Sequence, residues 1–295
     1  MSAKKEKILV TGADGFLGKY VSSMLRDHGI DHAPSAKSNL DILNKKDVVS
    51  KIKNFDVIIH LAGNIRTSAT DSAENHFNIN SLGTLNVLEA CRINKVPRII
   101  LASSAEVYGN PSRLGRINEL DIAAPVDFYG QSKLLAECFC RGYSEKFGIN
   151  FTVLRFTYLY GWGMYPSRVV SKIINSAAEN KKLHLLVGPR AFTDMLYVKD
   201  AARAILLVLL NKHSRNKIIN ISSGRKITVS DLIKTAKYFY PDLNFTISGK
   251  KEIGDYYIYD NNLARTILNF RPKYNLRAGF EDYINCMKVN YLGKK

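Results

Sequence analysis

The chain has 295 residues, of which 46% are hydrophobic and 23% are charged. These values are ordinary for a globular protein and exclude a disordered or collagen-like chain. The net charge is +17, but no run of five like charges occurs, so we expect no nucleic-acid partner. No apolar run approaches the roughly 20 residues of a membrane span, and no apolar leader opens the chain. We therefore expect a cytoplasmic protein with no membrane partner.

Short apolar runs alternate with amphipathic segments along most of the chain. A weaker strand is expected over 31–38. The apolar runs are typical of strands buried on both faces, and they occupy 7–10, 55–61, 98–102, 151–156 and 217–221. Apolar residues at helical spacing predict helices over 16–25, 74–94, 128–147, 169–179, 200–210 and 229–240. This alternation predicts an α/β fold with a doubly wound parallel sheet.

The region after Gly161 has longer loops and more aromatic residues than the part before it. We expect a smaller mixed lobe there, over 162–194 and 223–295, and a sheet domain over 1–161 and 195–222. Thr228 is expected to cap the helix that follows it, with Asp231 three residues on.

A glycine-rich stretch, TGADGFLG at 11–18, directly follows the first strand and opens a helix. Glycines permit a tight turn and a close approach of the backbone to a pyrophosphate, and the helix N-terminus supplies free N–H groups. The spacing alone is a weak signal, but its position between a strand and a helix predicts a dinucleotide site within a Rossmann sheet.

The end of the second strand indicates which dinucleotide is bound. An acidic residue is expected there when the ribose 2′-hydroxyl is bound, but the chain has Ser35, Ala36 and Lys37. A lysine beside hydroxyl groups favours a 2′-phosphate. The sequence therefore favours NADP over NAD, unless Lys37 is only a solvated loop residue.

Tyr129 and Lys133 lie one helical turn apart in the segment YGQSK. A neighbouring ammonium lowers the pKa of a phenol, and a phenol so tuned can exchange a proton with a carbinol oxygen during hydride transfer. We therefore expect Tyr129 to be the acid/base and Lys133 to adjust its pKa.

Several other residues have a structural interpretation. The histidines and cysteines lack metal-ligand spacing, so we expect no metal, reduced cysteines and a packed His60 in its strand. Trp162 either stacks on a base or packs in the lobe. Tyr256, Tyr257 and Tyr259 are expected to form a packed strand.

Ordered motifs over nearly the whole length give the chain a resemblance to the extended short-chain dehydrogenase/reductases, in the nucleotide-sugar epimerase/dehydratase group. Besides TGADGFLG and YGQSK, the matching stretches are HLAG (60–63), NINSLGTLNVLEAC (78–91), LASSAEVYG (101–109), LRFTYLYGWG (154–163), MLYVKDAARAI (195–205), NISSGRKITVSDL (220–232) and DNNLARTILNFRP (260–272). The resemblance implies a nucleotide-sugar substrate held in the smaller lobe, and a homodimer formed through the helices near 80–94 and 128–147.

The resemblance also implies roles for individual residues. Catalysis falls to Tyr129, Lys133, Ser104 and Glu106. The cofactor contacts comprise the pyrophosphate turn, the ribose and adenine end, the segment under the cofactor and the nicotinamide end: Gly12, Gly15, Phe16, Leu17, Gly18, Ser35, Lys37, Asp41, Ile42, Leu61, Ala62, Gly63, Asn80, Ser103, Tyr129, Lys133 and Phe156. The substrate contacts are Ser104, Glu106, Tyr158 and Arg190.

Three departures from the family pattern bear on the reaction. Dehydratases of the group often carry an acid where Ala105 stands, although their proton-abstracting glutamate is present as Glu106. An asparagine is common at Tyr158, and an arginine is common at Thr193. Arg190, three residues earlier, clamps an anionic group only if the loop is longer.

Together these features predict an NAD(P)-dependent enzyme that transfers hydride at the sugar C4 atom. A 4-ketosugar reductase is favoured by the indicated NADP preference and by Ala105. The alternatives are a 4-epimerase, then a 4,6-dehydratase or decarboxylase. A dinucleotide-binding sensor or assembly subunit also stays open, although such a protein has no need of Ser104, Tyr129 and Lys133.

Overall fold

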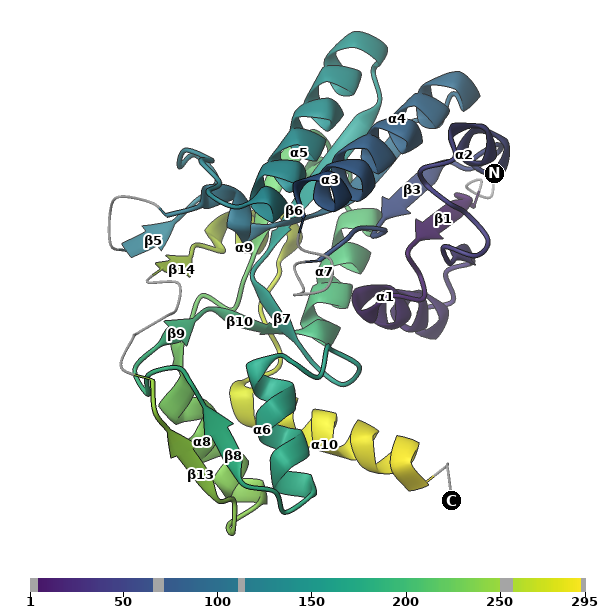
Figure 1. Ribbon diagram of the computed structural model, residues 1–295. Helices are drawn as coiled ribbons and strands as arrows, with labels where there is room; N and C mark the ends of the chain where they lie inside the picture. Colours follow the sequence, from purple (N-terminus) through teal and green to yellow (C-terminus); the bar gives the residue numbers. More distant parts are fainter. Residues whose placement is uncertain (1–4, 66–71, 111–114, 250–256, 293–295) are drawn as a thin grey trace.

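A six-stranded parallel sheet forms the centre of the larger lobe (Figure 1). The computed structural model describes residues 5–65, 72–110, 115–249 and 257–292. The strand order is β11-β6-β4-β3-β1-β2, and all five pairings are parallel. The strands are β1 (Ile8–Thr11), β2 (His32–Ser35), β3 (Val57–His60), β4 (Arg98–Ser104), β6 (Asn150–Phe156) and β11 (Lys217–Ile221). The predicted α/β fold with a parallel sheet is confirmed.

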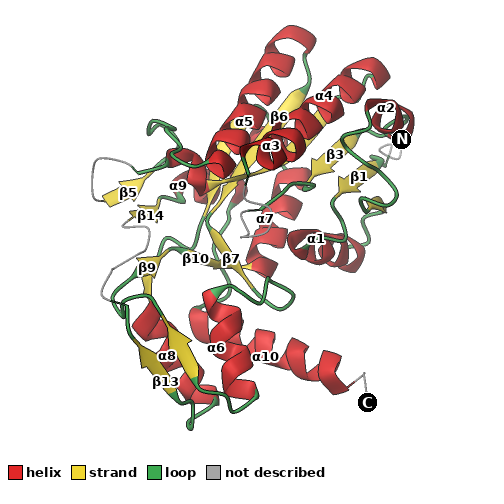
Figure 2. Ribbon diagram, viewed as in Figure 1, coloured by secondary structure: helices red, strands yellow, loops and turns green. Residues whose placement is uncertain are grey.

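Helices cover both faces of this sheet (Figure 2). One face packs against α2 (Lys45–Lys51), α4 (Gly83–Asn94) and α5 (Phe128–Phe147). The other face packs against α1 (Phe16–Asp27), α7 (Val198–Leu210) and α9 (Asn262–Leu268). Because both faces are covered, β1 and β3 are buried along their whole length, as the apolar runs predicted, whereas the edge strand β2 is only partly buried.

The helix predicted over 74–94 is interrupted. It consists of α3 (Ala73–His76), a π-helical turn η1 (Phe77–Leu82) and then α4. A π-turn contains an extra residue and interrupts the regular helical spacing. The buried Asn80 lies within this turn, and its side chain is hydrogen-bonded on two sides.

The smaller lobe has its own apolar core beneath the sheet domain in Figure 1. Its helices are α6 (Val169–Ala178), α8 (Val229–Phe239) and α10 (Leu276–Leu292). Its strand pairs are β8 (Leu183–Leu185) with β13 (Phe245–Ile247), and β9 (Phe192–Thr193) with β12 (Ile227–Thr228). Thr228 and Asp231 form the expected capping box at the start of α8.

Two further pairs of strands join the lobes. The first is β7 (Tyr158–Tyr160) with β10 (Met195–Tyr197), and the second is β5 (Gly115–Ile117) with β14 (Tyr257–Tyr259). After β14, helix α9 buries Ala264 and Leu268 against the sheet. Residues 257–270 therefore pack against the larger lobe, whereas the predicted division placed them in the smaller lobe. The rest of that division stays a prediction.

The short helical turns are η2 (Ala105–Tyr108) and η3 (Lys212–Ser214). The expected tyrosine strand is present as β14, while Tyr256 lies outside the described residues. Trp162 packs edge-on against Tyr283, with ring centroids 5.7 Å apart. All four cysteines are free thiols. Among the described residues, no helix combines the length and the hydropathy that crossing a membrane requires.

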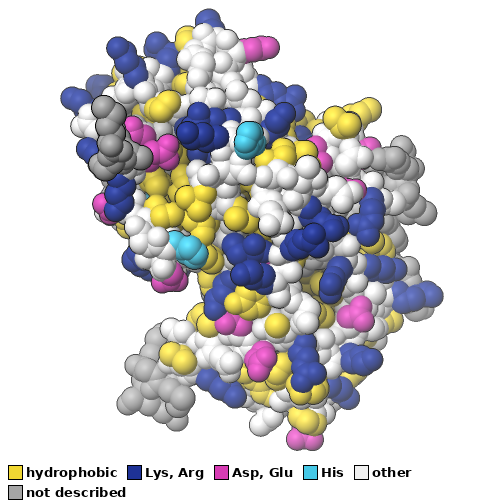
Figure 3. Space-filling model, turned by 180° about the vertical axis from the view of Figure 1, so that it is seen from behind, with side chains coloured by type: hydrophobic (Ala, Val, Ile, Leu, Met, Phe, Trp, Pro, Cys, Tyr) yellow, Lys and Arg dark blue, Asp and Glu magenta, His cyan; other side chains and the backbone are white. Residues whose placement is uncertain are grey.

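Lys and Arg side chains lie on both lobes of the face shown in Figure 3, with Asp and Glu side chains among them. The positive charge on this face is therefore dispersed rather than gathered into one stripe of the kind that follows a nucleic-acid backbone.

Candidate active site

The glycine-rich turn between β1 and α1 is built by close backbone contacts. Gly12 has φ +67°, and a Cβ atom there would lie 2.6 Å from the amide nitrogen of Ala62. A Cβ on Gly18 would lie 2.1 Å from the carbonyl oxygen of Gly12. Gly15 is the N-cap of α1 and has no side chain to cap the first turn. The N–H groups of that turn are therefore available to an anion at the positive end of the helix.

Two cavities of about 330 Å³ and about 220 Å³ border this turn. They share Gly12, Gly15, Leu61, Gly63 and Asn64 in their walls. An elongated ligand lying across the turn would reach into both cavities, with its charged centre at the N-terminus of α1. This arrangement fits a dinucleotide, whose pyrophosphate joins two nucleoside ends.

The smaller cavity is lined by Lys37, Asp41 and Ile42, all three of which were expected at the ribose and adenine end. Ser35 is buried outside the cavity wall, and it contributes its carbonyl oxygen to the amide of Ala13 at 3.1 Å. The Ser35 backbone therefore holds the turn after β1, and its contact with the ribose stays a prediction.

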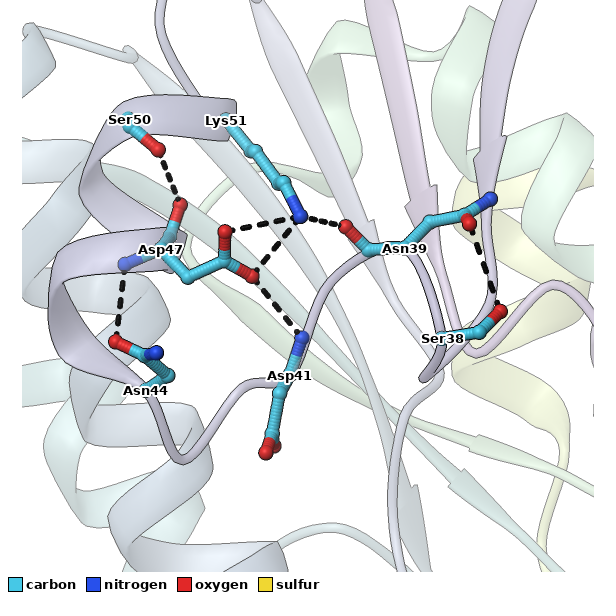
Figure 4. A network of polar contacts seen from close by, with 7 residues as sticks. All are labelled: Ser38, Asn39, Asp41, Asn44, Asp47, Ser50 and Lys51. Atoms are coloured by element: carbon cyan, nitrogen blue, oxygen red, sulfur yellow. Dashed lines mark hydrogen bonds and ion pairs between the residues drawn. The ribbon is translucent and has the colours of Figure 1, made fainter.

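Helix α2 fastens the loop that carries Asp41 (Figure 4). The Asp41 amide donates to Asp47 Oδ2 at 3.3 Å, and Lys51 Nζ lies 2.9 Å from Asp47 Oδ1. Lys51 also donates to the carbonyl oxygen of Asn39. Figure 4 shows the Asp41 carboxylate pointing away from this network. Asp47 and Lys51 of α2 therefore hold this loop through its backbone.

The larger cavity brings together Ser104, Tyr129 and Lys133. Ser104 ends β4, whereas Tyr129 and Lys133 lie in the first turns of α5, whose N-cap Asp127 accepts from the Gly130 amide at 2.7 Å. Lys133 Nζ donates to the carbonyl oxygen of Ala102 at 3.0 Å. The end of a parallel strand and the start of the neighbouring helix thus form one wall.

The pKa of Tyr129 does not follow the sequence expectation. Burial raises it to about 12, while a hydrogen bond with Ser104 lowers it and the charge of Glu106 raises it. Lys133 Nζ lies 5.9 Å from the centroid of the Tyr129 ring and donates its hydrogen bond to Ala102. The expected acidic phenol is therefore wrong for the protein alone, because desolvation of the phenolate is the largest influence on its pKa.

Lys133 itself is almost fully buried, with 7% of its surface exposed. Burial lowers its pKa to about 8, and the charge of Glu137 acts in the opposite direction. Near neutral pH the lysine is mostly charged and carries three hydrogen-bond donors, one of which is used on Ala102.

Asn80 was expected among the cofactor contacts, but it lines neither cavity. Its Oδ1 accepts from the Asn64 amide at 2.7 Å, and its Nδ2 donates to Ser132 Oγ at 2.9 Å. Asn80 therefore fastens the loop after β3 to α5. In that loop Leu61 and Gly63 line the larger cavity, and Ala62 lines the smaller one.

The remaining predicted contacts have mixed outcomes. Phe16, Leu17, Gly18, Ser103, Phe156, Glu106 and Tyr158 line the larger cavity. Arg190 is exposed in the turn before β9 and lies outside both cavity walls. The expectation that it clamps the substrate is therefore not supported by its position.

Arg168 was missed by the sequence analysis. It is the N-cap residue of α6. Among the described residues, Arg168 and Lys133 are the two cationic side chains that line the larger cavity. Its guanidinium lies 5.6 Å from the centroid of the Tyr158 ring. Its position directly before the helix predicted over 169–179 was the available signal.

The fold and the site together define an NAD(P)-dependent enzyme of the short-chain dehydrogenase/reductase class. The sequence profile of the NAD dependent epimerase/dehydratase family matches residues 8–222. A protein of Methanocaldococcus jannaschii, provisionally named a UDP-glucose 4-epimerase, is 31% identical over 96% of this chain and 99% of its own length. The chain therefore belongs to the NAD dependent epimerase/dehydratase family.

Solved structures extend this comparison. The UDP-glucose 4-epimerase of Thermotoga maritima has the same fold, with a TM-score of 0.89 and 22% identity over 97% of this chain and 99% of that one. The UDP-glucuronic acid 4-epimerase of Bacillus cereus, solved in complex with NAD, has a TM-score of 0.84 and 25% identity over 97% of this chain and 98% of that one.

Proposed function

We propose that the protein is a nucleotide-sugar 4-epimerase that uses NAD, rather than the 4-ketosugar reductase that the sequence favoured. The observation that carries this proposal is the placement of Ser104, Tyr129 and Lys133 in one cavity wall beside the glycine turn. Relatives named as 4-epimerases match nearly the full length of the chain. The homodimer implied by the family remains a prediction.

In this proposal each polar side chain has one task. Tyr129 takes the proton from the sugar C4 hydroxyl and later returns it, and Ser104 donates a hydrogen bond to the same oxygen. Lys133 holds the ribose hydroxyls and favours the phenolate. Bound NAD supplies the acceptor for the C4 hydride and adds a positive charge that helps to offset the burial of Tyr129.

The cofactor is proposed to be NAD, although Lys37 alone indicated NADP. The family is NAD dependent, and the Bacillus cereus relative holds NAD. In this chain Asp14 and Asp41 line the smaller cavity beside Lys37. Two carboxylates there oppose the charge of a 2′-phosphate.

Arg168 is proposed to hold an anionic group of the nucleotide sugar. Lys133 is engaged at the end of the larger cavity near Gly63, where a Cβ atom would lie 3.1 Å from its Nζ. In the part of the chain that the structure describes, Arg168 is the other cation in the lining of this cavity, which also contains Glu106 and Tyr158. A guanidinium binds phosphate or carboxylate oxygens in pairs.

The decisive experiment incubates the purified protein with UDP-glucose and with UDP-glucuronic acid, without added reduced cofactor, and analyses the sugars by NMR. We expect the C4 epimer of at least one substrate and no net change in NADH absorbance. Tyr129→Phe should lower the rate by about 100-fold or more, because it removes the proton-transfer group. Stoichiometric consumption of NADH or NADPH with a 4-keto nucleotide sugar would instead identify a reductase.

Glu106 supports a second candidate, a 4,6-dehydratase. Its side chain lines the cavity and its charge acts on Tyr129, so it can act as a base near the sugar. The neighbouring residue that would protonate a leaving hydroxyl is Ala105, which has no proton to give. Loss of water to form a 4-keto-6-deoxy sugar in the same NMR experiment would identify this reaction.

A further inference from the structure

Glu137 is a carboxylate with no exposed surface, four residues after Lys133 and eight after Tyr129 on α5. Positions four apart lie on one face of a helix. Glu137 lines neither cavity, so the proposed mechanism does not use it. A buried carboxylate is costly unless it is paired and hydrogen-bonded.

Its partners come from two neighbouring strands. Ser103 Oγ donates to Glu137 Oε1 at 2.5 Å. Arg155 donates through Nε to Oε1 at 3.1 Å and through its terminal nitrogen to Oε2 at 2.7 Å. Ser103 on β4 and Arg155 on β6 are paired in the sheet register. The ion pair therefore joins α5 to both strands.

Two successive residues at the end of β4 are held by the same face of α5. The carbonyl oxygen of Ala102 accepts from Lys133, and Ser103 donates to Glu137. The next residue, Ser104, lowers the pKa of Tyr129 on that face. Glu137 thus completes the contact surface that sets Lys133 and Tyr129 against the strand.

The charged and titratable groups around Lys133 come from three elements. On β3, burial lowers the pKa of His60 to about 3, so that ring is neutral at pH 7. On α5, Tyr129 is a neutral phenol at pH 7, and Glu137 is the acidic member of an ion pair. On β6, Arg155 is the cation of that ion pair. Glu137 is therefore the negative group in this set.

We propose that the buried Glu137–Arg155 pair is a positioning element of the active site, which provides the counter-charge for the ammonium of Lys133 and fixes the hydroxyl of Ser103. This inference rests on the proposed function only in requiring a charged Lys133 for turnover. Arg155 in turn lies 4.7 Å from the ring centroid of Tyr108. The Arg155 side chain is therefore held between Glu137 and the ring of Tyr108.

The test compares Glu137→Gln with the double variant Glu137→Gln/Arg155→Met. The double variant matters because a lone buried Arg155 can prevent folding, whereas replacing both members of a buried pair is often tolerated. The readout is the titration of Lys133, followed by NMR of lysines labelled at Cε. Lys133→Met identifies the Lys133 resonance, since that variant lacks it.

We expect the Lys133 midpoint to fall by about one pH unit in the double variant, because the charge of Glu137 that raises the pKa of Lys133 is removed. It should fall further in Glu137→Gln, where the cation of Arg155 is left unpaired. The alkaline limb of kcat/KM should move in the same order. A merely structural role would lower stability and leave the midpoint in place.

Asp200→Asn is the matched control, since Asp200 is a buried carboxylate paired with Arg203 away from Lys133. An unchanged Lys133 midpoint in the folded Glu137 variants, or an equal shift in Asp200→Asn, would overturn the inference. If the midpoint moves as expected but the wild-type protein epimerises neither nucleotide sugar, the proposed function fails and the inference stands.

Discussion

Lys133 is a buried amine whose proposed role requires charge. Its surroundings lower its pKa from 10.5 to about 8, and such a shift corresponds to roughly 3 kcal/mol of folding free energy when the lysine is protonated. The site thus retains a residue that destabilises the fold at neutral pH. The proposed activity accounts for this cost.

Replacement of this lysine should therefore stabilise the protein. Between pH 8 and 10.5 the unfolded chain holds one more proton at this position than the folded chain, so the wild-type free energy of unfolding rises with pH. Lys133→Met should be about 2 to 3 kcal/mol more stable than wild type at pH 7, with a smaller difference at pH 10. Urea unfolding at the two pH values measures this, and equal stabilities at pH 7 would refute it.

Arg168 and Arg190 offer a matched pair of arginines at the residue scale. Arg168 lines the larger cavity and Arg190 does not. Arg168→Gln should raise the KM for the nucleotide sugar about 10- to 100-fold, because a charged hydrogen bond to an anion is lost. Arg190→Gln should leave the KM within about twofold, as expected for a substitution away from the substrate. Steady-state kinetics of both variants give the two KM values. Equal changes in KM would contradict the assignment of Arg168 to the substrate.

At the scale of elements, the π-helical turn η1 links the loop after β3 to helix α5. The extra residue of the turn allows Asn80 to bond the backbone of Asn64 on one side and Ser132 on the other. Ser132 precedes Lys133 in α5. The turn therefore sets the distance between the loop after β3 and the helix that carries Tyr129 and Lys133.

Asn80→Ala should weaken both the fold and the site. It leaves buried polar groups without partners, so the free energy of unfolding should fall by about 2 to 4 kcal/mol. NAD binding should weaken as well, because the loop carrying Gly63 is released. Asn80→Asp keeps an acceptor for the Asn64 amide and should lie between wild type and Asn80→Ala. Thermal unfolding and NAD titration test this order, and wild-type values for Asn80→Ala would contradict it.

The sequence predicted those elements whose order follows from periodicity along the chain. The apolar runs of β3 and β4 and the glycine turn before α1 could be recognised because each signal lies within about ten residues. The turn η1 could not be recognised, because its partners are contributed by a distant loop and helix. Arg168 was missed for a similar reason, since its place in the cavity wall depends on how α6 packs in the smaller lobe.

The pKa of Tyr129 illustrates the same limit at the level of chemistry. The spacing of Tyr129 and Lys133 predicts that they are neighbours, and the structure places them so. The sequence contains no measure of how deeply the phenol is buried. That burial decides the direction of the shift in the protein alone.

At the scale of the whole molecule, segments from both ends of the chain close one cavity. Gly12 and Tyr259 both line the larger cavity. The amide of Tyr259 also donates to the buried carboxylate of Asp194 at 3.3 Å. In the smaller lobe, Asp282 of α10 accepts from Lys199 at 2.7 Å and from Tyr197. The two lobes are therefore interleaved rather than joined by a single linker.

This interleaving has a consequence for biosynthesis. A nascent chain emerging from the ribosome presents β1 to β6 first, yet the larger cavity lacks part of its lining until Tyr259 has left the exit tunnel. The core of the smaller lobe also waits for Phe280 and Tyr283 in α10. Synthesis must therefore pass Tyr283 before both the cavity and the smaller lobe are complete.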